Sequence, residues 1–404
     1  MNDRPEQQSI ISGIGISPIG RRTGRAGIDL TVSASTAAIT DAGLTPGDID
    51  GIATMGDTPL VEAAAALGIE PQYTGGGFDT GGLLSPLMSA CVAVGEGRAR
   101  HVLVYRTVQM MGGSIAPSSS GGGGRGGGGA SSPPRGGPTP DEARLVSVMG
   151  DMATLLTYHA YSAANWLAMH CQRHMYLYGT TKEQLGWLAI NSRRNAGLNP
   201  LAVYRDPMTM DDYLGARVVS TPFGLYDCDV PIDGSIAFVV SGVEHADDTP
   251  HPAIRVQALG GSSAGGGWIH RPDYPKMGSV DAAAEMWSRT DLRPADVDIA
   301  ELYDGFTFIT LAWLEALGLC GEGESGPFVE GATRIALDGE LPLNTYGGQL
   351  SAGRMHGYWV MHEACVQLRG DAGERQVRTR GGTPEVAVVA NGGGPIAGCL
   401  LVTR

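Results

Sequence analysis

Three glycine-rich segments in the second half of the chain carry side chains that could do acid–base chemistry. They are YDGF (303–306), which follows the apolar run IAEL, NTYGGQLSAGRMHG (344–357) and NGGGP (391–395). Glycine permits the backbone conformations that tight turns need, and junctions after strands are where α/β proteins build their sites. The candidate catalytic residues in these segments are Tyr303, Asp304, Asn344, Tyr346, Arg354, His356 and Asn391.

One segment of the first half adds a candidate nucleophile. GGLLSP (81–86) places Ser85 directly before Pro86, which is typical of a helix N-cap followed by proline at the first helical position. A side chain there faces the positive end of the helix dipole, where a thiolate or another anion is stabilised. Ser85 is therefore a candidate site residue, and a simple helix cap is the alternative.

Several other motifs favour structural interpretations. GIGISPIG (13–20) lacks the spacing of a dinucleotide-binding loop, and DCDVPIDGS (227–235) lacks the ligand spacing of a calcium loop. His170 and His174 share one helix face, but no third ligand with metal spacing lies near them. We therefore expect no metal site, and we interpret 227–235 as a turn before a strand.

The composition limits the class of protein. The chain has 404 residues, 42% of them hydrophobic, and a net charge of −14, which argues against a nucleic-acid surface. Its polar start and the lack of long apolar runs predict no signal peptide and no membrane span. Six cysteines without a CxxC pair indicate a reducing, cytoplasmic setting. The only lysines, Lys182 and Lys276, lie in polar segments, so a lysine imine mechanism is not expected.

An internal repeat indicates a duplicated unit. GLTPGDIDGI (43–52) matches DLRPADVDIA (291–300) at Leu, Pro, Asp and Asp in the same register, and each follows an Ala-rich helical stretch. GGLLS (81–85) and GGQLS (347–351) form a second match in the same order. Two such matches predict two copies of one α/β unit.

Short apolar segments that alternate with helical stretches predict an α/β fold with mixed sheets. The first half carries an insertion at about 108–220, which opens with a flexible glycine-rich loop (112–137) and continues with helices near 152–179 and 182–197. A linker lies near 245–252. The predicted strands are 9–16, 101–106, 235–242, 253–259, 385–390 and 399–403.

These segments together resemble the thiolase superfamily, in its sterol-carrier-protein-x or lipid-transfer branch. The resemblance implies five stacked layers, α-β-α-β-α, built from a first half (1–250) and a second half (251–404). It is carried by IISGIGISPIG (10–20), RRNAGLNPLAVYRDPMT (193–209), LYDCDVPIDGSIAFVV (225–240), LYDGFT (302–307), LEALGLCGEGE (314–324), PLNTYGGQLSAG (342–353) and QLRGDAGERQV (367–377).

The chain departs from the thiolase pattern at the positions that do thiolysis. The nucleophilic cysteine of thiolases falls on Ser85, and their acid–base cysteine falls near Asn391. Their His-Pro pair begins at Arg354, and the residue that binds the thioester oxygen falls on Tyr303. The resemblance therefore implies that the thiolytic apparatus is missing.

Relatives with the same losses are similar to steroid side-chain aldolases, which act on a β-hydroxyacyl-CoA. The resemblance implies retro-aldol cleavage of a bulky, steroid-type side chain to a carbonyl product and a shorter acyl-CoA. Tyr303 would be the proton donor or enolate stabiliser, and His356 the base, because an ordinary imidazole titrates near neutral pH. Arg354 replaces the second tyrosine of those relatives. CoA would be part of the substrate, with no covalently bound cofactor.

Two other classes stay open. One is an acyl-CoA acyltransferase or condensing enzyme that uses Ser85 or a cysteine, and the other is a non-catalytic acyl-CoA-binding subunit. The resemblance also implies a homodimer and a small OB-fold, zinc-ribbon partner protein. Arg193, Arg194 and Arg205, in the insertion, are the candidates for binding the CoA phosphates.

Overall fold

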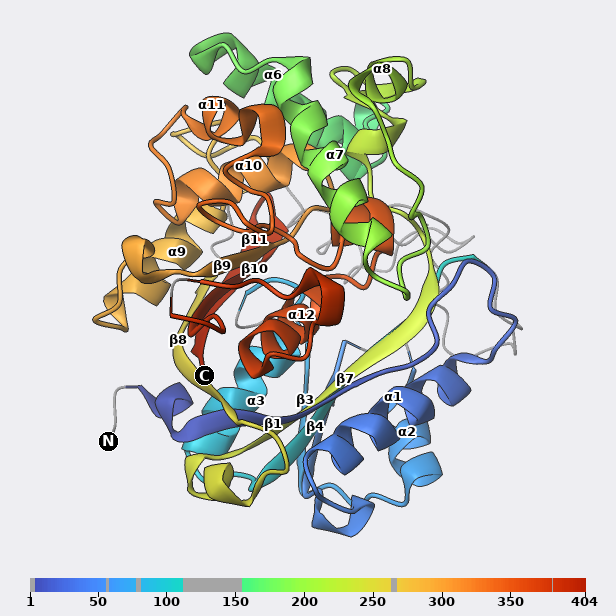
Figure 1. Cartoon of the computed structure of the whole chain (residues 1–404). Coiled ribbons are helices and arrows are strands. Elements are labelled where there is room, and N and C mark those ends of the chain that lie inside the picture. The colour runs from blue at the N-terminus through green and yellow to red at the C-terminus, as the bar shows by residue number, and fades with distance from the viewer. Residues whose placement is uncertain (1–3, 56–57, 78–80, 112–154, 263–266, 380) are drawn as a thin grey trace.

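The structure of the chain is a computed structural model that describes residues 4–55, 58–77, 81–111, 155–262, 267–379 and 381–404 (Figure 1). Within these residues, the main sheet has nine strands in the order β3-β2-β4-β7-β1-β8-β11-β10-β9. All six predicted strands overlap strands of this sheet. The strands are β1 (Ser9–Ile16), β2 (Gly51–Thr54), β3 (Tyr73–Gly76), β4 (His101–Gln109), β7 (Asp233–Gly242), β8 (Ile254–Ser262), β9 (Ile299–Leu302), β10 (Val386–Gly393) and β11 (Ile396–Thr403).

The sheet is the same arrangement used twice. The halves join where β1 pairs with β8, and from that joint each half continues with two antiparallel pairings and then a parallel one. The first half ends with β3 parallel to β2, and a parallel bridge between Ala300 and Leu343 takes that place beside β9. The duplication that the repeats predict is therefore present in the strand order.

The repeated aspartates accept equivalent backbone hydrogen bonds in both halves. Asp48 and Asp296 each accept, at 2.8 Å, the backbone N–H of the residue three positions earlier, where a short 3₁₀ turn begins. Asp50 accepts the N–H of His101 at the start of β4, and Asp298 accepts the N–H of Val386 at the start of β10. The sequence match reflects repeated backbone capping.

Helices fill the three remaining layers. Side chains from α3 (Ser85–Gly95) and α12 (Tyr358–Arg369) share one core with both half-sheets, and Figure 1 shows these helices between the halves. The outer face of the first half packs on α1 (Gly27–Asp41) and α2 (Leu60–Leu67). The outer face of the second packs on α9 (Ser279–Ser288) and α10 (Thr307–Ala316). This is the expected five-layer arrangement.

Glycines let the outer helices lie directly on the strands. A Cβ at Gly13 of β1 would lie 2.1 Å from the Ala38 carbonyl oxygen of α1. A Cβ at Gly260 of β8 would lie 1.9 Å from the Ala282 carbonyl oxygen of α9. In both halves, therefore, a glycine allows an outer helix to pack closely against a strand.

The insertion forms the upper part of the molecule in Figure 1. It contains α6 (Ala163–Tyr178), α7 (Lys182–Gly197), α8 (Met210–Leu214) and the short pair β5 (Val218–Ser220) and β6 (Phe223–Gly224), close to α11 (Ser325–Val329). The second predicted helix is confirmed, whereas α6 begins only at Ala163, because Ser162 and Asn165 cap it there. The glycine-rich loop (112–137) lies outside the described residues, and the boundary at 250 stays a prediction. No helix in the described part of the chain is long and apolar enough to cross a membrane.

Candidate active site

Tyr303 lies directly after β9, at the end of the second half-sheet. Its backbone N–H donates to the Ala390 carbonyl at 2.9 Å, which extends the β9–β10 pairing by one residue. A Cβ at Gly305 would lie 2.6 Å from the Tyr303 ring, so glycine leaves room for the ring there. Burial, with the negative charge of Asp229, raises the pKa of the Tyr303 phenol. Tyr303 is therefore protonated at neutral pH and can donate a hydrogen bond or a proton.

Asp304 holds the neighbouring turn in place. Its carboxylate accepts the backbone N–H groups of Gln349 and Leu350 at 2.8 and 3.4 Å, within a single π-helical turn (Gly348–Ala352). Burial raises the pKa of Asp304 to about 7, although both N–H groups oppose the shift. Asp304 is committed to these backbone contacts, so its position fits a positioning residue.

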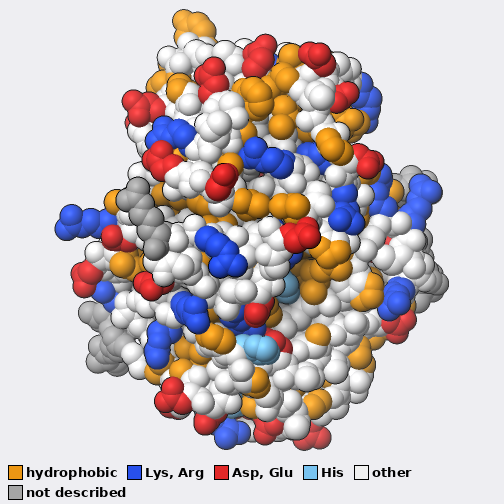
Figure 2. All heavy atoms as spheres, viewed as in Figure 1, with side chains coloured by type: hydrophobic (Ala, Val, Ile, Leu, Met, Phe, Trp, Pro, Cys, Tyr) orange, Lys and Arg blue, Asp and Glu red, His pale blue; other side chains and the backbone are white. Residues whose placement is uncertain are grey.

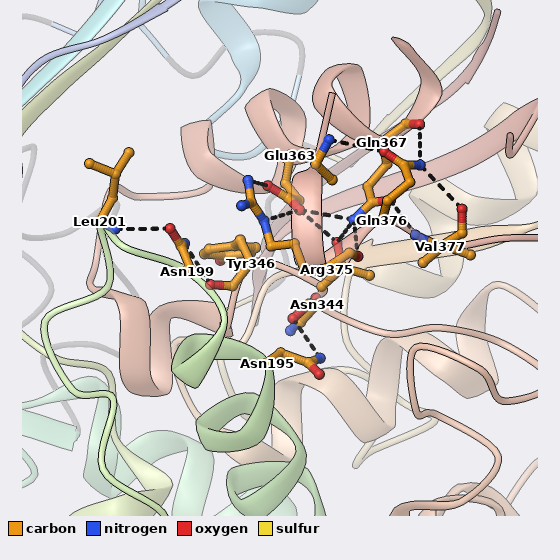
Figure 3. A network of polar contacts seen from close by, with 12 residues as sticks. Asn195, Asn199, Leu201, Asn344, Tyr346, Glu363, Gln367, Arg375, Gln376 and Val377 are labelled. Atoms are coloured by element: carbon orange, nitrogen blue, oxygen red, sulfur yellow. Dashed lines mark hydrogen bonds and ion pairs between the residues drawn. The ribbon is translucent and has the colours of Figure 1, made fainter. Parts of the chain in front are cut away.

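Asn344 is also a positioning residue. Its Oδ1 accepts the Leu302 N–H at 2.7 Å, one residue before Tyr303, and its side chain is 2% exposed. Its own carbonyl accepts a hydrogen bond from Asn195 of α7 at 3.2 Å (Figure 3). Asn344 thereby links the insertion to the strand that carries Tyr303.

Tyr346 lies deep in the core rather than at an open surface. Its side chain is fully buried, its ring stacks on Trp359 with centroids 5.2 Å apart, and its carbonyl accepts a hydrogen bond from Asn199 at 2.8 Å (Figure 3). Among the described residues its hydroxyl has no hydrogen-bond partner. We conclude that Tyr346 supports the loop and does not contact a substrate from this position.

Thr345 anchors the same loop to two buried carboxylates. Its hydroxyl lies 2.7 Å from Glu301 Oε1 and 2.9 Å from Glu363 Oε1. Arg375 pairs with both oxygens of Glu363 at 2.8 and 3.0 Å, and Gln367 donates to Glu363 at 3.1 Å (Figure 3). Burial and then the charge of Glu363 raise the pKa of Glu301 well above its ordinary value. Glu301 is therefore the protonated member of the pair.

Arg354 forms an ion pair with an aspartate that the sequence did not single out. Its Nη1 lies 3.2 and 3.4 Å from the two carboxylate oxygens of Asp229, and its Nε donates to the Met110 sulfur at 3.1 Å. The side chains of Arg354 and Asp229 are only 16% and 10% exposed. Burial raises the pKa of Asp229 to about 6, although the guanidinium of Arg354 lowers it in part. Tyr303, Arg354 and Asp229 thus form one electrostatic cluster.

His356 contacts a second arginine from the other half of the fold. Its Nδ1 lies 2.5 Å from Nη2 of Arg106 on β4. A guanidinium only donates, so we assign Nδ1 as the acceptor and place the ring proton on Nε2. Burial, and then the charges of Arg106 and Arg354, lower the pKa of His356 well below its ordinary value. His356 is therefore neutral. Its backbone φ of +49° is uncommon outside glycine and often marks a functional site.

Asn391 is fully buried and connects three segments of the site. Its Oδ1 accepts the Leu83 N–H at 2.7 Å, and its Nδ2 donates to the His356 carbonyl at 3.1 Å. A Cβ at Gly357, where φ is +85°, would lie 1.4 Å from Asn391 Nδ2. The β10 strand, the loop before α3 and the His-Gly loop are therefore fixed by one amide.

Ser85 is the first residue of α3, and Leu84 is its N-cap, so the predicted N-cap assignment is wrong by one residue. The reason is that Leu84, with ψ near 6°, is the last non-helical residue before Pro86 enters the first turn. The Ser85 side chain is completely buried. The helix start is near the site through Leu83, but the serine itself does not face an open space.

Comparisons with known proteins agree with this geometry. Residues 261–400 match the family described as Thiolase C-terminal domain-like. A steroid side-chain-cleaving aldolase of Thermomonospora curvata is 32% identical, over 97% of this chain and 97% of that protein. A 17-hydroxy-3-oxo-4-pregnene-20-carboxyl-CoA lyase of Mycobacterium tuberculosis is 32% identical, over 98% of this chain and 99% of that protein. The chain belongs to the thiolase superfamily.

A solved structure of this superfamily, the Ltp2-ChsH2(DUF35) aldolase, matches with a TM-score of 0.85, at 28% identity and with 98% of each chain covered. The expected family and the thiolase-like fold are thereby confirmed. The relatives named as an aldolase and a lyase match along nearly the whole chain, including the insertion.

The cysteines of this thiolase-superfamily member are chemically quiet. All six are free, and burial raises the pKa of every thiol. The values reach about 12 for Cys91, Cys228, Cys320 and Cys365. A thiol with so high a pKa is protonated at neutral pH and is a poor nucleophile. The structure therefore places no reactive thiolate in the described site.

The three arginines expected to bind CoA do not form one patch. Arg193 is buried, with Nε donating to Ser351 Oγ at 2.9 Å. Arg194, its neighbour on α7, points elsewhere and donates to the Ala332 carbonyl at 3.3 Å, as adjacent helix residues must. Arg205 is exposed beyond the end of α7. Of the three, Arg194 and Arg205 are exposed, and Arg205 directly follows Tyr204, outside α7.

The two histidines with metal-like spacing are engaged in other contacts. The ring nitrogens of His170 lie 2.8 and 2.7 Å from the carbonyls of Pro275 and Trp268, and His174 pairs with Glu315 at 3.0 Å. Within the described residues, no group of three or more His, Cys, Asp and Glu side chains could hold a metal ion.

Exposed apolar side chains gather on the insertion. In the described part of the chain, nearly all large exposed apolar residues lie between 158 and 225; the exceptions are Val61 and Ile396. Figure 2 shows such side chains on the upper part of the molecule, where Figure 1 places α6 to α8. An open groove of about 520 Å³ on α6 is lined by residues that include Met169 and Tyr176. This surface is distinct from the cluster around Tyr303.

Proposed function

We propose that the chain is a carbon–carbon lyase that cleaves the side chain of a bulky, steroid-type β-hydroxyacyl-CoA by retro-aldol chemistry. The observation that carries this proposal is the protonated Tyr303 beside the Arg354–Asp229 ion pair, in a site whose cysteines are inert. Two relatives that match nearly the whole chain are named as a steroid side-chain-cleaving aldolase and a lyase of a hydroxylated steroid CoA thioester. Their names supply the substrate class.

Retro-aldol cleavage makes three demands on a site. A base must take the proton of the β-hydroxyl group while the Cα–Cβ bond breaks. Hydrogen-bond donors must stabilise the thioester enolate that forms, because its oxygen gains negative charge. A proton donor must then protonate the α carbon. None of these steps needs a nucleophile or free CoA.

Tyr303 meets the demand for a proton donor. Its raised pKa keeps the phenol protonated, and its hydroxyl lies close enough to Arg354 and Asp229 for their charges to act on it. The guanidinium supplies positive charge where the enolate develops, and low exposure strengthens that attraction. In this proposal Arg354 serves the reaction electrostatically, in the place of the second tyrosine of the similar aldolases.

For His356 we propose a role different from the base that its ordinary pKa suggested. Since Nδ1 accepts from Arg106, the available ring position is the Nε2–H, which donates. A neutral imidazole held in this tautomer is suited to bind the thioester oxygen and its enolate. Asn391 fixes the loop that carries His356, and so acts as a positioning residue.

The CoA end of the substrate is proposed to lie along an exposed rim made by Arg21, Tyr204 and Arg205. Arg21 contacts the Tyr204 hydroxyl and lies over its ring at 5.6 Å. The Tyr204 N–H donates to the Ser351 carbonyl at 3.0 Å, which ties the rim to the turn that Asp304 holds. Exposed guanidinium groups suit phosphates, and this rim is unusual in a chain with a net charge of −14.

The acyl-transfer alternative requires a nucleophile that an acyl group can reach. Ser85 is completely buried, and every thiol has a raised pKa. These observations favour the lyase proposal. A non-catalytic binding subunit would not need the Tyr303–Arg354–Asp229 cluster, and catalysis measured on this chain separates the two cases.

Partners are part of the proposal. The name of the solved aldolase that matches this chain includes a DUF35 component. We therefore propose that this chain works with a small OB-fold, zinc-ribbon protein of that type. The apolar surface of the insertion is the proposed contact face. The homodimer and the cytoplasmic location stay predictions, and light scattering of the pure chain, with and without the partner, measures the assembly.

The function is tested with a steroid 17-hydroxy side-chain CoA thioester. Purified chain, alone and with a DUF35 partner, should convert it to a ketone and a shorter acyl-CoA when no free CoA is present, as followed by mass spectrometry. If turnover instead requires free CoA and yields two thioesters, the reaction is thiolysis and the proposal is wrong.

A further inference from the structure

We propose that Asp229 is the general base of this reaction and takes the proton of the β-hydroxyl group as the Cα–Cβ bond breaks. The inference rests on the proposed retro-aldol function and names a residue that neither the repeats nor the glycine-rich loops indicated. It is carried by the backbone that places Asp229 and by the contacts that occupy Asp304, Glu301 and His356.

The backbone brings Asp229 to the centre of the cluster. Its N–H donates to the Gly305 carbonyl at 3.1 Å, two residues after Tyr303. The next N–H, that of Val230, donates to the Gln349 carbonyl at 2.9 Å, and the Val230 carbonyl accepts the Arg354 N–H at 2.8 Å. The Asp229 segment is therefore held between the strand end that carries Tyr303 and the loop that carries Arg354.

A buried anchor two residues earlier makes this placement rigid. The Asp227 carboxylate is fully buried and pairs with Lys182, accepts the Tyr213 hydroxyl, and accepts the Thr307 hydroxyl at 2.8 Å. Its Oδ2 also accepts the Gly224 N–H at 2.6 Å. Because Asp227 accepts hydrogen bonds from several donors, it fixes the chain at the start of α10. Asp229, which is paired with Arg354, is the carboxylate of the two with acceptor capacity left.

The remaining acids and the histidine of the site are committed elsewhere. Asp304 accepts two backbone N–H groups, and Glu301 is bound to Thr345. His356 presents a proton at Nε2, because Nδ1 accepts from Arg106. In the described part of the chain, the side-chain partner of Asp229 is Arg354 alone, so the carboxylate retains acceptor capacity for a hydroxyl group.

The proposed step is balanced in atoms and electrons and needs no further reactant. The O–H bond breaks and its proton goes to Asp229, while the oxygen lone pair becomes the new C=O bond. The Cα–Cβ electron pair becomes the thioester enolate, which takes a proton at Cα from Tyr303. Exchange with water then removes the proton from Asp229 and returns one to Tyr303.

The electrostatics support this assignment. Burial and Arg354 together leave the pKa of Asp229 raised to about 6, so most of the carboxylate is ionised at neutral pH and is still basic enough to accept a proton. The ionised fraction falls as the pH drops through about 6. The acidic side of the pH–rate profile should therefore report this residue.

The test compares Asp229→Asn with Asp229→Glu and with Asp247→Asn, a matched change at an exposed aspartate. Asp229→Asn keeps the size of the side chain and removes the base, so kcat should fall about 10²- to 10⁴-fold. The acidic limb near pH 6 should disappear from the residual rate. Asp229→Glu should recover part of the rate and restore a limb, and Asp247→Asn should match the unaltered chain.

Thermal unfolding and the Kd for an acyl-CoA without the β-hydroxyl group show whether Asp229→Asn still folds and binds. Loss of rate with both retained supports the assignment. If the wild-type chain cleaves the thioester and Asp229→Asn keeps both the rate and the acidic limb, Asp229 is not the general base. The proposed function is then unaffected. If Asp229→Asn is misfolded, Asp229→Glu provides the test. A folded Asp229→Glu variant with an unshifted acidic limb also shows that Asp229 is not the general base. A wild-type chain without cleavage refutes the proposed function itself.

Discussion

The guanidinium of Arg106 and the imidazole of His356 meet at 2.5 Å across the two halves of the fold. Arg106 comes from β4 of the first half, where 6% of it is exposed, and His356 comes from a loop of the second. The contact fixes the tautomer of the ring, and the charge of Arg106 adds to burial in lowering the pKa of His356. The first half therefore influences the chemistry of a residue in the second.

Replacement of Arg106 by Met should free the Nδ1 of His356. The adjacent positive charge disappears, so the pKa of His356 should rise towards its ordinary value, and the ring should titrate closer to neutral pH. The histidine ring signals in an NMR titration measure this directly, with the cleavage rate expected to fall. Arg106→Lys is the matched control, since it keeps the charge. An unchanged titration in Arg106→Met would contradict the proposed effect of Arg106 on His356, provided that the unfolding temperature shows a folded variant.

Tyr303→Phe removes the proposed proton donor without changing the packed ring. We expect kcat to fall about 10²- to 10⁴-fold, because proton transfer by a placed side chain contributes on that scale. The Kd for a substrate analogue should change little, since the ring remains. Tyr73→Phe, at a half-buried position on the edge strand β3, is the control and should leave the rate unaltered. A Tyr303→Phe variant with full activity would exclude Tyr303 from the chemistry.

Much of the fold could be predicted from local sequence signals. The Leu, Pro, Asp and Asp pattern marked both copies because Asp48 and Asp296 cap identical turns and Asp50 and Asp298 cap equivalent strands. Apolar, β-branched runs marked the longer strands. Such signals are local, and the same backbone contacts recur wherever the unit is repeated.

The site could be predicted only in part, because its decisive contacts are long-range. Tyr303, Arg354 and His356 stood out through their glycine-rich loops, but Asp229 is 125 residues away from Arg354 and Arg106 is 250 away from His356. The spacing within DCDVPIDGS does not distinguish Asp227, which is held by several hydrogen bonds, from Asp229, which is paired with Arg354. The role of base for His356 was likewise predicted from the ordinary pKa of an imidazole, which does not include the effect of an arginine on a distant strand.

Gly357→Ala should displace His356 while the rest of the fold stays intact. An alanine Cβ would lie 1.4 Å from Asn391 Nδ2, so the His-Gly loop or the Asn391 amide must move. Gly179→Ala is a matched control: its φ of +76° is similar to the +85° of Gly357, but its Cβ would meet nothing within 4 Å. Both variants have a similar backbone strain, about 1–2 kcal/mol, so a loss of activity confined to Gly357→Ala reports the clash. Equal activity in both variants would show that Asn391 does not hold the loop.

The buried carboxylate pair beneath the loop predicts a pH-dependent stability. The pKa of Glu301 is raised above its unfolded value near 4.5, so its contribution is fully present below pH 4.5 and is lost as the pH rises through the folded pKa. Glu301→Gln keeps an acceptor for Thr345 and cannot ionise. Its free energy of unfolding, relative to that of the unaltered chain, should therefore increase from pH 4.5 upwards.

Denaturant unfolding of Glu301→Gln at a series of pH values measures this difference, with Glu62→Gln as the exposed control. The control should show the same pH dependence as the unaltered chain, because an exposed carboxylate interacts only weakly with the rest of the fold. A difference between Glu301→Gln and the unaltered chain that stays constant with pH would mean that Glu301 is ionised in the fold. In that case Arg375 would neutralise both carboxylates rather than Glu363 alone, and the loop that carries Asn344 and Tyr346 would rest on a charged pair.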